Sequence, residues 1–154
     1  MIPSFYDGSS FTAYTFFGAH IEPNGVLFRV YAPNANAVSV IGDFNDWQPA
    51  PMEREENPGV WYLWYEGAQE GQRYKYRIDE YGGRTRDRAD PFGRGSELRP
   101  ATCSVITETG RFQFTDEKWM KGRAADFYNK PINIYEVHMG SWKKPDGEGW
   151  YTCR

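Results

Sequence analysis

Trp47 is the side chain whose position in the sequence most suggests recognition chemistry. It lies in a loop, residues 44–49, that also carries Asn, Asp and Pro, the residue types that turns prefer. A loop of this kind can present the indole to solvent, where its flat face would stack on a sugar ring. Large aromatic side chains also commonly pack over the end of a sheet, so the sequence leaves both positions open for Trp47.

Glu136 and His138 form a second arrangement with chemical potential. They lie two apart in residues 132–139, whose β-branched and aromatic composition predicts a strand. Residues two apart in a strand point to the same side, so this pair could act as a general acid and base. His20, by contrast, is interpreted as a structural hydrogen-bonding residue at the start of a strand.

Charge excludes one class of partner. The chain has 154 residues and a formal net charge of −3. Its basic residues are scattered, and the closest group, Arg84, Arg86 and Arg88, is interrupted by Asp87. Alternating charges of this kind are typical of a solvated face, so we expect no nucleic-acid partner.

Hydropathy and cysteine usage exclude further classes. No apolar run approaches the roughly 20 residues of a membrane span, and no signal pattern follows Met1. We therefore expect a cytoplasmic chain without a membrane partner. Cys103 and Cys153 are distant from each other and from both histidines, so we expect free thiols and no metal site. We also expect no cofactor.

Short strand-like runs separated by Gly, Pro and Asn predict an all-β fold. The runs are residues 25–31, 38–41, 60–65, 73–78 and 102–106. Almost no helical periodicity accompanies them, so we expect an immunoglobulin-like antiparallel β-sandwich over about residues 17–110. The aromatic fraction of 18% fits both an aromatic β core and a sugar-binding surface.

Alternation along the predicted strands assigns several side chains to a face. Lys75 should point to solvent between the inward-facing Tyr74 and Tyr76. Trp61 and Trp64 lie three apart on one strand and so point to opposite faces. At most one of these two tryptophans can therefore belong to the core.

Composition divides the chain into four parts. Residues 1–16 form an N-terminal extension, and residues 17–112 form the sandwich. Residues 113–130 form a linker, in which a short helical turn is expected from Asp116 on. Residues 131–154 contain the strand predicted over 132–139 and end without a helix cap or a turn.

Three segments, in this order, resemble the front end of glycogen branching enzymes of the α-amylase superfamily. Gly18-Ala19-His20, residues 25–33 and residues 38–47, which end in Gly42-Asp43-Phe44-Asn45-Asp46-Trp47, resemble a family-48 carbohydrate-binding module. Tyr74-Lys75-Tyr76-Arg77, Arg88-Ala89-Asp90-Pro91-Phe92-Gly93 and Arg99-Pro100-Ala101-Thr102 are similar to the later strands of that module. Residues 134–142 resemble the segment that opens the catalytic (β/α)8 barrel of these enzymes.

The resemblance implies the N-terminal module of a 1,4-alpha-glucan branching enzyme, which acts in glycogen biosynthesis. Such enzymes cleave α-1,4 links and form α-1,6 branches by retaining chemistry, which uses two carboxyl groups about 5 Å apart. The family takes these from later barrel strands, so we assign no catalytic residue, and Glu136 and His138 would pack inside a truncated (β/α)8 barrel. We expect this chain alone to be inactive. Its implied partners are α-1,4-glucan and its own catalytic barrel, which it would brace.

The resemblance also implies three glycan-binding residues. Trp47 matches a stacking Trp of related glycogen-binding modules. Lys75 matches a position that hydrogen-bonds a sugar hydroxyl, although alternation alone would simply place it in solvent. Tyr81 lies near the position where stand-alone modules carry a second stacking Trp.

Several alternatives stay open at this point. They are the N-terminal module of a debranching enzyme or of a trehalose-releasing hydrolase, a glycogen-binding subunit of a kinase, and a purely structural interaction sandwich. Residues 134–142 favour the branching enzymes, because a kinase subunit would not continue into a barrel strand. The loop that carries Trp47 would have no explanation in a purely structural sandwich.

Overall fold

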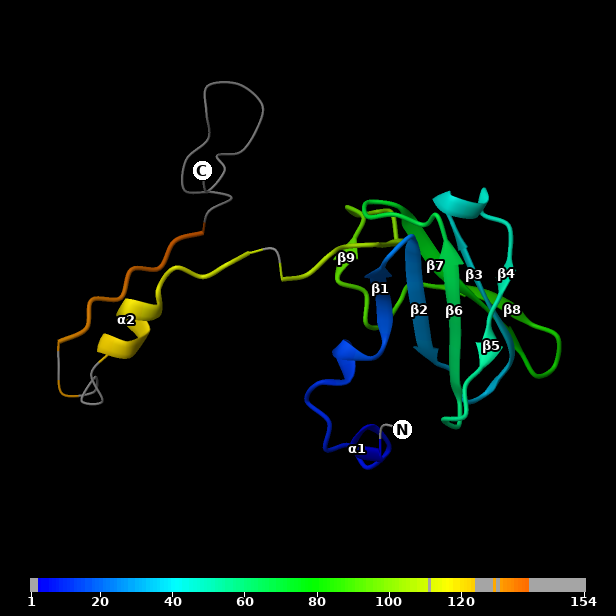
Figure 1. Cartoon of the computed structure of the whole chain (residues 1–154), viewed down its shortest axis with the longest axis horizontal. Coiled ribbons are helices and arrows are strands. Elements are labelled where there is room, and N and C mark those ends of the chain that lie inside the picture. The colour runs from blue at the N-terminus through cyan, green and yellow to red at the C-terminus, as the bar shows by residue number, and fades with distance from the viewer. Residues whose placement is uncertain (1–2, 111, 124–128, 130, 139–154) are drawn as a thin grey trace, which may run out of the picture. The chain divides into compact units, whose positions relative to one another are not determined.

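Two antiparallel β-sheets lie face to face and enclose an apolar core (Figure 1). The computed structural model describes residues 3–110, 112–123, 129 and 131–138. The chain divides into two units, Met1–Phe112 and Gln113–Arg154. Both sheets belong to the first unit, and each unit is described by itself.

The first sheet has four strands in the order β1-β2-β6-β5. Its strands are β1 Gly18–Glu22, β2 Gly25–Tyr31, β5 Glu53–Arg54 and β6 Val60–Glu66. Val26, Phe28 and Val30 alternate along β2 and are buried, because every second side chain of a strand points to the same face.

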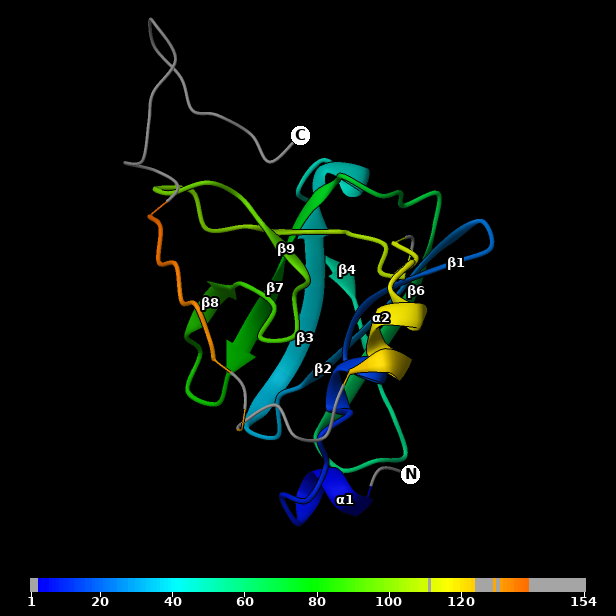
Figure 2. The ribbon, with the colours of Figure 1, turned by 90° about the vertical axis from the view of Figure 1, so that its left-hand side faces the viewer.

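The second sheet has six strands, with β4-β3-β7-β10-β9 in order and β8 also paired to β7. Its strands are β3 Ala35–Gly42, β4 Ala50–Pro51, β7 Arg73–Glu80, β8 Thr85–Arg88, β9 Gly95–Ser96 and β10 Ser104–Val105. Gly42 pairs with Tyr74 and Ile41 with Lys75, so the end of β3 lies beside the start of β7. Figure 2 shows β3, β7 and β8 as neighbours in this sheet.

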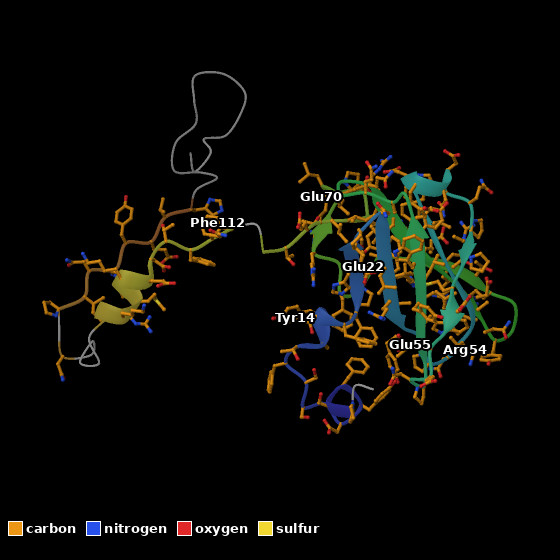
Figure 3. All side chains as sticks on the ribbon, viewed as in Figure 1. Tyr14, Glu22, Arg54, Glu55, Glu70 and Phe112 are labelled. Carbon is orange, nitrogen blue, oxygen red and sulfur yellow. The ribbon has the colours of Figure 1, made fainter. Side chains whose placement is uncertain are left out.

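Side chains from both sheets fill the space between them (Figure 3). Fully burying one large apolar side chain contributes about 1.5–3 kcal/mol, so this core is the main source of stability. Trp61 is 5% exposed and belongs to the core, whereas Trp64 is 42% exposed. The predicted division of these two tryptophans between opposite faces is confirmed.

The segment before β1 packs at one end of the sandwich. It contains helix α1, Pro3–Tyr6, and the 3-10 turn η1, Ala13–Thr15. The ring of Phe5 lies 4.6 Å from that of Phe17 and 5.1 Å from that of Tyr31. A further 3-10 turn, η2, Asp43–Asn45, lies at the opposite end of the sandwich (Figure 1).

The predicted immunoglobulin-like β-sandwich is confirmed. The run over residues 25–31 coincides with β2, and the three following runs lie within β3, β6 and β7. The run over 102–106 shortens to the two residues of β10. Strands β4, β5 and β9 also have two residues each, which is too short to produce an alternating pattern in the sequence.

The second unit requires one correction. Helix α2, Glu117–Gly122, confirms the helical turn predicted after Asp116. Residues 131–138 carry no regular secondary structure, so the strand predicted over 132–139 is not formed there. A strand is stabilised by backbone hydrogen bonds to a neighbouring strand, which β-branched composition alone does not supply. Residues 139–154, including Gly140, Ser141, Trp142 and Cys153, lie outside the described residues.

Candidate functional site

Trp47 has a strained backbone at the point where η2 leads towards β4. The φ angles of Asp46 and Trp47 are 52° and 59°, in the left-handed region. This region is a genuine outlier for a bulky side chain. Such conformations cost about 1–3 kcal/mol each and cluster at functional sites, where the surrounding structure enforces them. The backbone therefore marks Trp47 as a candidate functional residue.

Hydrogen bonds to the end of β3 enforce this turn. The backbone N–H of Trp47 donates to the carbonyl oxygen of Gly42 at 2.9 Å. The Asn45 side chain accepts from the N–H of Gly42 at 2.8 Å and donates to the carbonyl oxygen of Val40 at 3.1 Å. The loop is thereby tied to a central strand of the sheet, which holds Trp47 in place.

The Asp43 carboxylate connects Trp47 to the start of β7. Its Oδ1 accepts from the indole Nε1–H of Trp47 at 3.2 Å and from Nη2–H of Arg73 at 2.9 Å. Its Oδ2 accepts from the backbone N–H and from Nε–H of Arg73, at 2.8 and 2.9 Å. The hydrogen bonds from the Arg73 side chain hold the pKa of Asp43 below its ordinary value, so the carboxylate is ionised at neutral pH.

Arg73 also reaches the segment between β9 and β10. Its Cζ lies 5.9 Å from the centroid of the Trp47 ring, near the outer limit for a cation–π contact. Its Nη1 donates to Glu97 at 3.3 Å, and Glu97 also accepts the backbone N–H of Cys103 at 3.0 Å. Arg73 therefore joins three segments: the η2 loop, β7 and the β9–β10 connection.

Lys75 lies two residues after Arg73, on the outer face of the same strand. Its neighbours Tyr74 and Tyr76 are buried, which confirms the predicted alternation. The Nζ of Lys75 donates to Oγ1 of Thr102 at 2.8 Å. Because Arg73 contacts the indole, the structure brings Trp47 and Lys75 to the same end of the six-stranded sheet.

Tyr81 lies at the other end of β7. It directly follows Glu80, the last residue of the strand, and is 70% exposed. At about 3.3 Å per residue, it is roughly 20 Å from Lys75 along the strand. The structure therefore does not group Tyr81 with Trp47 and Lys75.

The remaining candidates are His20, Glu136 and His138. The Nε2 of His20 lies 3.0 Å from the carbonyl oxygen of Phe17, which supports its structural role. Burial lowers the pKa of His20. Glu136 and His138 are exposed in a segment without regular secondary structure, so no acid–base pair is assigned.

Metal sites and membrane spans are two further classes to compare with the described ranges. Among residues 3–110, 112–123, 129 and 131–138, no group of three or more His, Cys, Asp or Glu side chains could hold a metal ion. None of the helices that the structure describes is both long and apolar enough for a membrane crossing. Cys103, half-buried, is a free thiol.

The sequence did not single out Asp43 and Arg73 as members of this site. Asp43 precedes Trp47 by four positions, and this spacing within a turn was the one local indication. Arg73 lies 30 positions after Asp43, so their contact depends on the pairing of β3 with β7.

One protein family and several curated enzymes match this chain. Residues 16–93 match carbohydrate-binding module 48 (isoamylase N-terminal domain). The 1,4-alpha-glucan branching enzyme GlgB of Fusobacterium nucleatum is 40% identical over 97% of this chain and 25% of that enzyme. The GlgB of Bacillus subtilis is 42% identical over the same shares. The GlgB of Protochlamydia amoebophila is 49% identical over 82% of this chain and 18% of that enzyme. The chain thus spans about a quarter or less of these relatives.

Two solved structures that share this fold are named as pullulanase or PulA, not as branching enzymes. Pullulanase from Bacillus acidopullulyticus is 26% identical with a TM-score of 0.51, over 60% of this chain and 12% of that one. PulA from Klebsiella oxytoca is 25% identical with a TM-score of 0.52, over 60% and 9%. The identity to the branching enzymes is higher and extends over more of this chain.

Proposed function

The chain belongs to the carbohydrate-binding module 48 family, and on this basis we propose that it binds linear α-1,4-glucan through Trp47 and Lys75. The observation that carries the proposal is the strained, hydrogen-bonded loop that presents Trp47. Packing an indole over the end of a sheet does not require a left-handed backbone, whereas holding a ring-stacking platform justifies its cost.

Each proposed residue has its own role in the glucan site. The Trp47 indole would stack on the apolar face of a glucose ring, and the Lys75 ammonium would donate to sugar hydroxyls. Tyr81 would provide a second ring contact to a glucan long enough to follow β7. Affinity should be modest, because sugar hydroxyls exchange water for protein with little net gain.

The similarity over 97% of the chain places this module with the N-terminal region of 1,4-alpha-glucan branching enzymes. We propose that the longer polypeptide is a cytoplasmic enzyme that cleaves α-1,4 links and forms α-1,6 branches in glycogen. Within it, residues 17–112 would form the glucan-binding sandwich, residues 113–130 the linker, and residues 131–154 the start of the catalytic barrel. The catalytic carboxylates would lie in later barrel strands.

The exposure of Trp64 supports a second proposed role for this module, which is to brace the catalytic barrel. It is 42% exposed and lies opposite Leu27, on the outer face of the four-stranded sheet. Burying such a ring against another domain would stabilise the longer polypeptide by the hydrophobic effect. Trp64→Ala in the parent enzyme should then lower the thermal midpoint of the whole enzyme and leave that of this chain nearly unchanged.

The glucan site is tested by titrating this chain with maltoheptaose while following tryptophan fluorescence. Trp47→Ala should weaken binding at least about tenfold, or about 1.4 kcal/mol. Trp64→Ala is the matched control, because it removes another indole, 42% exposed, from the outer face of the other sheet. No saturable binding by the folded wild-type chain, or equal losses in both variants, would contradict the proposal.

A further inference from the structure

We propose that Asp43 and Arg73 form a clamp that holds the Trp47 indole in one orientation, and that this orientation sets the affinity of the glucan site. The predicted effect of this clamp on affinity rests on the proposed function, because it presupposes that glucan binds at Trp47. The orientation of the indole itself can be measured without any glucan.

A single carboxylate carries the Asp43–Arg73 clamp. It receives four hydrogen bonds: three from Arg73, through the backbone N–H, Nε and Nη2, and one from the Trp47 indole. The two guanidinium bonds form a fork, which fixes direction as well as distance. The clamp thus ties the η2 turn to the first residue of β7.

The clamp constrains the indole at two places. Its edge is held by the Nε1–H bond to Asp43 at 3.2 Å, and its face lies under the Arg73 guanidinium at 5.9 Å. The side chain of Trp has two rotatable bonds, so one contact at the edge and one at the face are sufficient to define the plane of the ring. The strained backbone of Trp47 would otherwise favour relaxation of the loop.

The geometry assigns Arg73 a role in positioning the Trp47 indole. A guanidinium has five N–H groups. In Arg73 three of them point to carboxylates, two to Asp43 and one to Glu97. Donors already bonded to carboxylates would lose those bonds by turning to a neutral hydroxyl, so Arg73 would remain with Asp43 and Glu97 when glucan binds.

An indole already fixed in its bound orientation binds with a smaller loss of conformational freedom. Ordering one large side chain at an interface weakens binding by about two- to tenfold. Loss of the clamp should therefore weaken glucan binding by about this factor. This is less than the loss expected for Trp47→Ala, since the platform itself remains.

Arg77 provides a matched control on the same strand. It lies two residues after Lys75 on the outer face and forks onto Asp87 at 2.8 and 3.0 Å. Arg77→Gln removes the same kind of surface ion pair as Arg73→Gln without breaking any bond to Asp43. A general effect of losing one Arg–Asp fork would appear in both variants.

The test compares Arg73→Gln, Asp43→Asn and Arg77→Gln with the wild-type chain. The indole N–H resonance of Trp47, assigned by its absence in Trp47→Ala, reports its hydrogen bond in nitrogen–proton correlation spectra. Maltoheptaose titrations report affinity, and far-UV circular dichroism confirms folding. Arg73→Gln and Asp43→Asn should both shift the Trp47 resonance and weaken binding about two- to tenfold. Arg77→Gln should change neither.

The two measurements separate failure of the clamp from failure of the glucan site. Folded Arg73→Gln and Asp43→Asn variants with an unshifted Trp47 resonance and wild-type affinity would overturn the clamp while the glucan site stood. The same resonance shift in Arg77→Gln would also overturn it. A shift confined to the two clamp variants, in a chain that binds no maltoheptaose, would support control of orientation, and the proposed glucan function would fail.

Discussion

Strand β7 contacts carboxylates on both of its sides, at different depths. On the inner side, the hydroxyls of Tyr74 and Tyr76 donate to Oδ2 of Asp90 at 2.6 and 3.1 Å. On the outer side, the guanidinium groups of Arg73 and Arg77 fork onto Asp43 and Asp87.

The inner contacts are buried. Asp90 is 7% exposed, and its Oδ1 also accepts the backbone N–H of Phe92 at 2.8 Å. A buried carboxylate is costly to desolvate unless its oxygens accept hydrogen bonds, and here both do. Removing one member of these contacts leaves a buried polar atom of another member without a hydrogen bond, which is costly. Substitutions on the inner side should therefore have large effects on the free energy of unfolding.

The outer contacts are partly in water. The side chains of Arg77 and Asp87 are 33% and 37% exposed. Exposed ion pairs contribute about 0–1 kcal/mol and are screened by salt. The outer side should therefore have little influence on unfolding, although its forks can still orient neighbouring side chains such as Trp47. Hydrogen bonds to a carboxylate should thus contribute more to stability on the buried inner side of β7 than on its exposed outer side.

Asp90→Ala should give the largest effect and so test the inner side directly. It removes the acceptor of two buried hydroxyls, and we expect a loss of about 3 kcal/mol in the free energy of unfolding. Urea unfolding followed by tryptophan fluorescence would measure it. Asp87→Ala is the outer control and should cost less than about 1 kcal/mol. Equal losses would show that depth does not explain the difference.

The two sides should also respond to pH in opposite directions. Burial raises the pKa of Asp90, so the folded chain keeps a proton that the unfolded chain releases above about pH 4. Its contribution to stability therefore falls as pH rises through that window. Hydrogen bonds from Arg77 lower the pKa of Asp87, whose contribution is present above the ordinary pKa and is lost as pH falls through the folded one.

These opposite slopes can be separated by substitution. One proton changes the free energy of unfolding by at most about 1.4 kcal/mol per pH unit. Asp90→Asn should remove the decline towards higher pH, and Asp87→Asn should remove part of the loss in acid. Urea titrations between about pH 3 and pH 7 would show both effects. If stability depended on pH in the same way in both variants, the inner and outer carboxylates would not differ as proposed.

Tyr76→Phe should give a smaller effect on the inner side. It removes one of the donors to Asp90 and keeps the buried ring, so we expect a loss of about 1 kcal/mol. Tyr62→Phe removes an exposed hydroxyl that donates to Glu53 at 2.8 Å, and it should leave the urea midpoint unchanged. A larger shift for Tyr62→Phe would argue against the role of burial.

Arg77→Gln should lower stability by less than Tyr76→Phe does. We expect a loss below about 1 kcal/mol, which should shrink further in 1 M salt because the fork to Asp87 is exposed. Urea unfolding at low and high salt would measure this. A loss that is large and independent of salt would show that the outer contacts stabilise the chain as strongly as the buried inner ones.

Much of the fold could be predicted from local patterns. Alternation placed Tyr74 and Tyr76 inside and Lys75 outside, and it separated Trp61 from Trp64. Residues 132–139 show the limit of this reasoning, because a strand-like composition was not followed by a strand in residues 131–138. Side-chain alternation is a property of the backbone itself, whereas strand formation requires a neighbouring strand.

The candidate site could be predicted only in part. The turn residues around Trp47 marked it from the sequence, but its left-handed backbone was not evident there. Tyr81 shows the converse, because the resemblance grouped it with Trp47 and Lys75, whereas the structure places it at the far end of β7.

The order of residues is sufficient to assign each side chain to one face of its strand, because that depends on a backbone period of two residues. The contact between Asp43 and Arg73 instead requires the folded chain, since residues 30 positions apart come together through the pairing of β3 with β7. The burial of Asp90 likewise depends on the folded chain. An Asp in a sequence is normally a surface residue, and the packing of two sheets around it is required to enclose it.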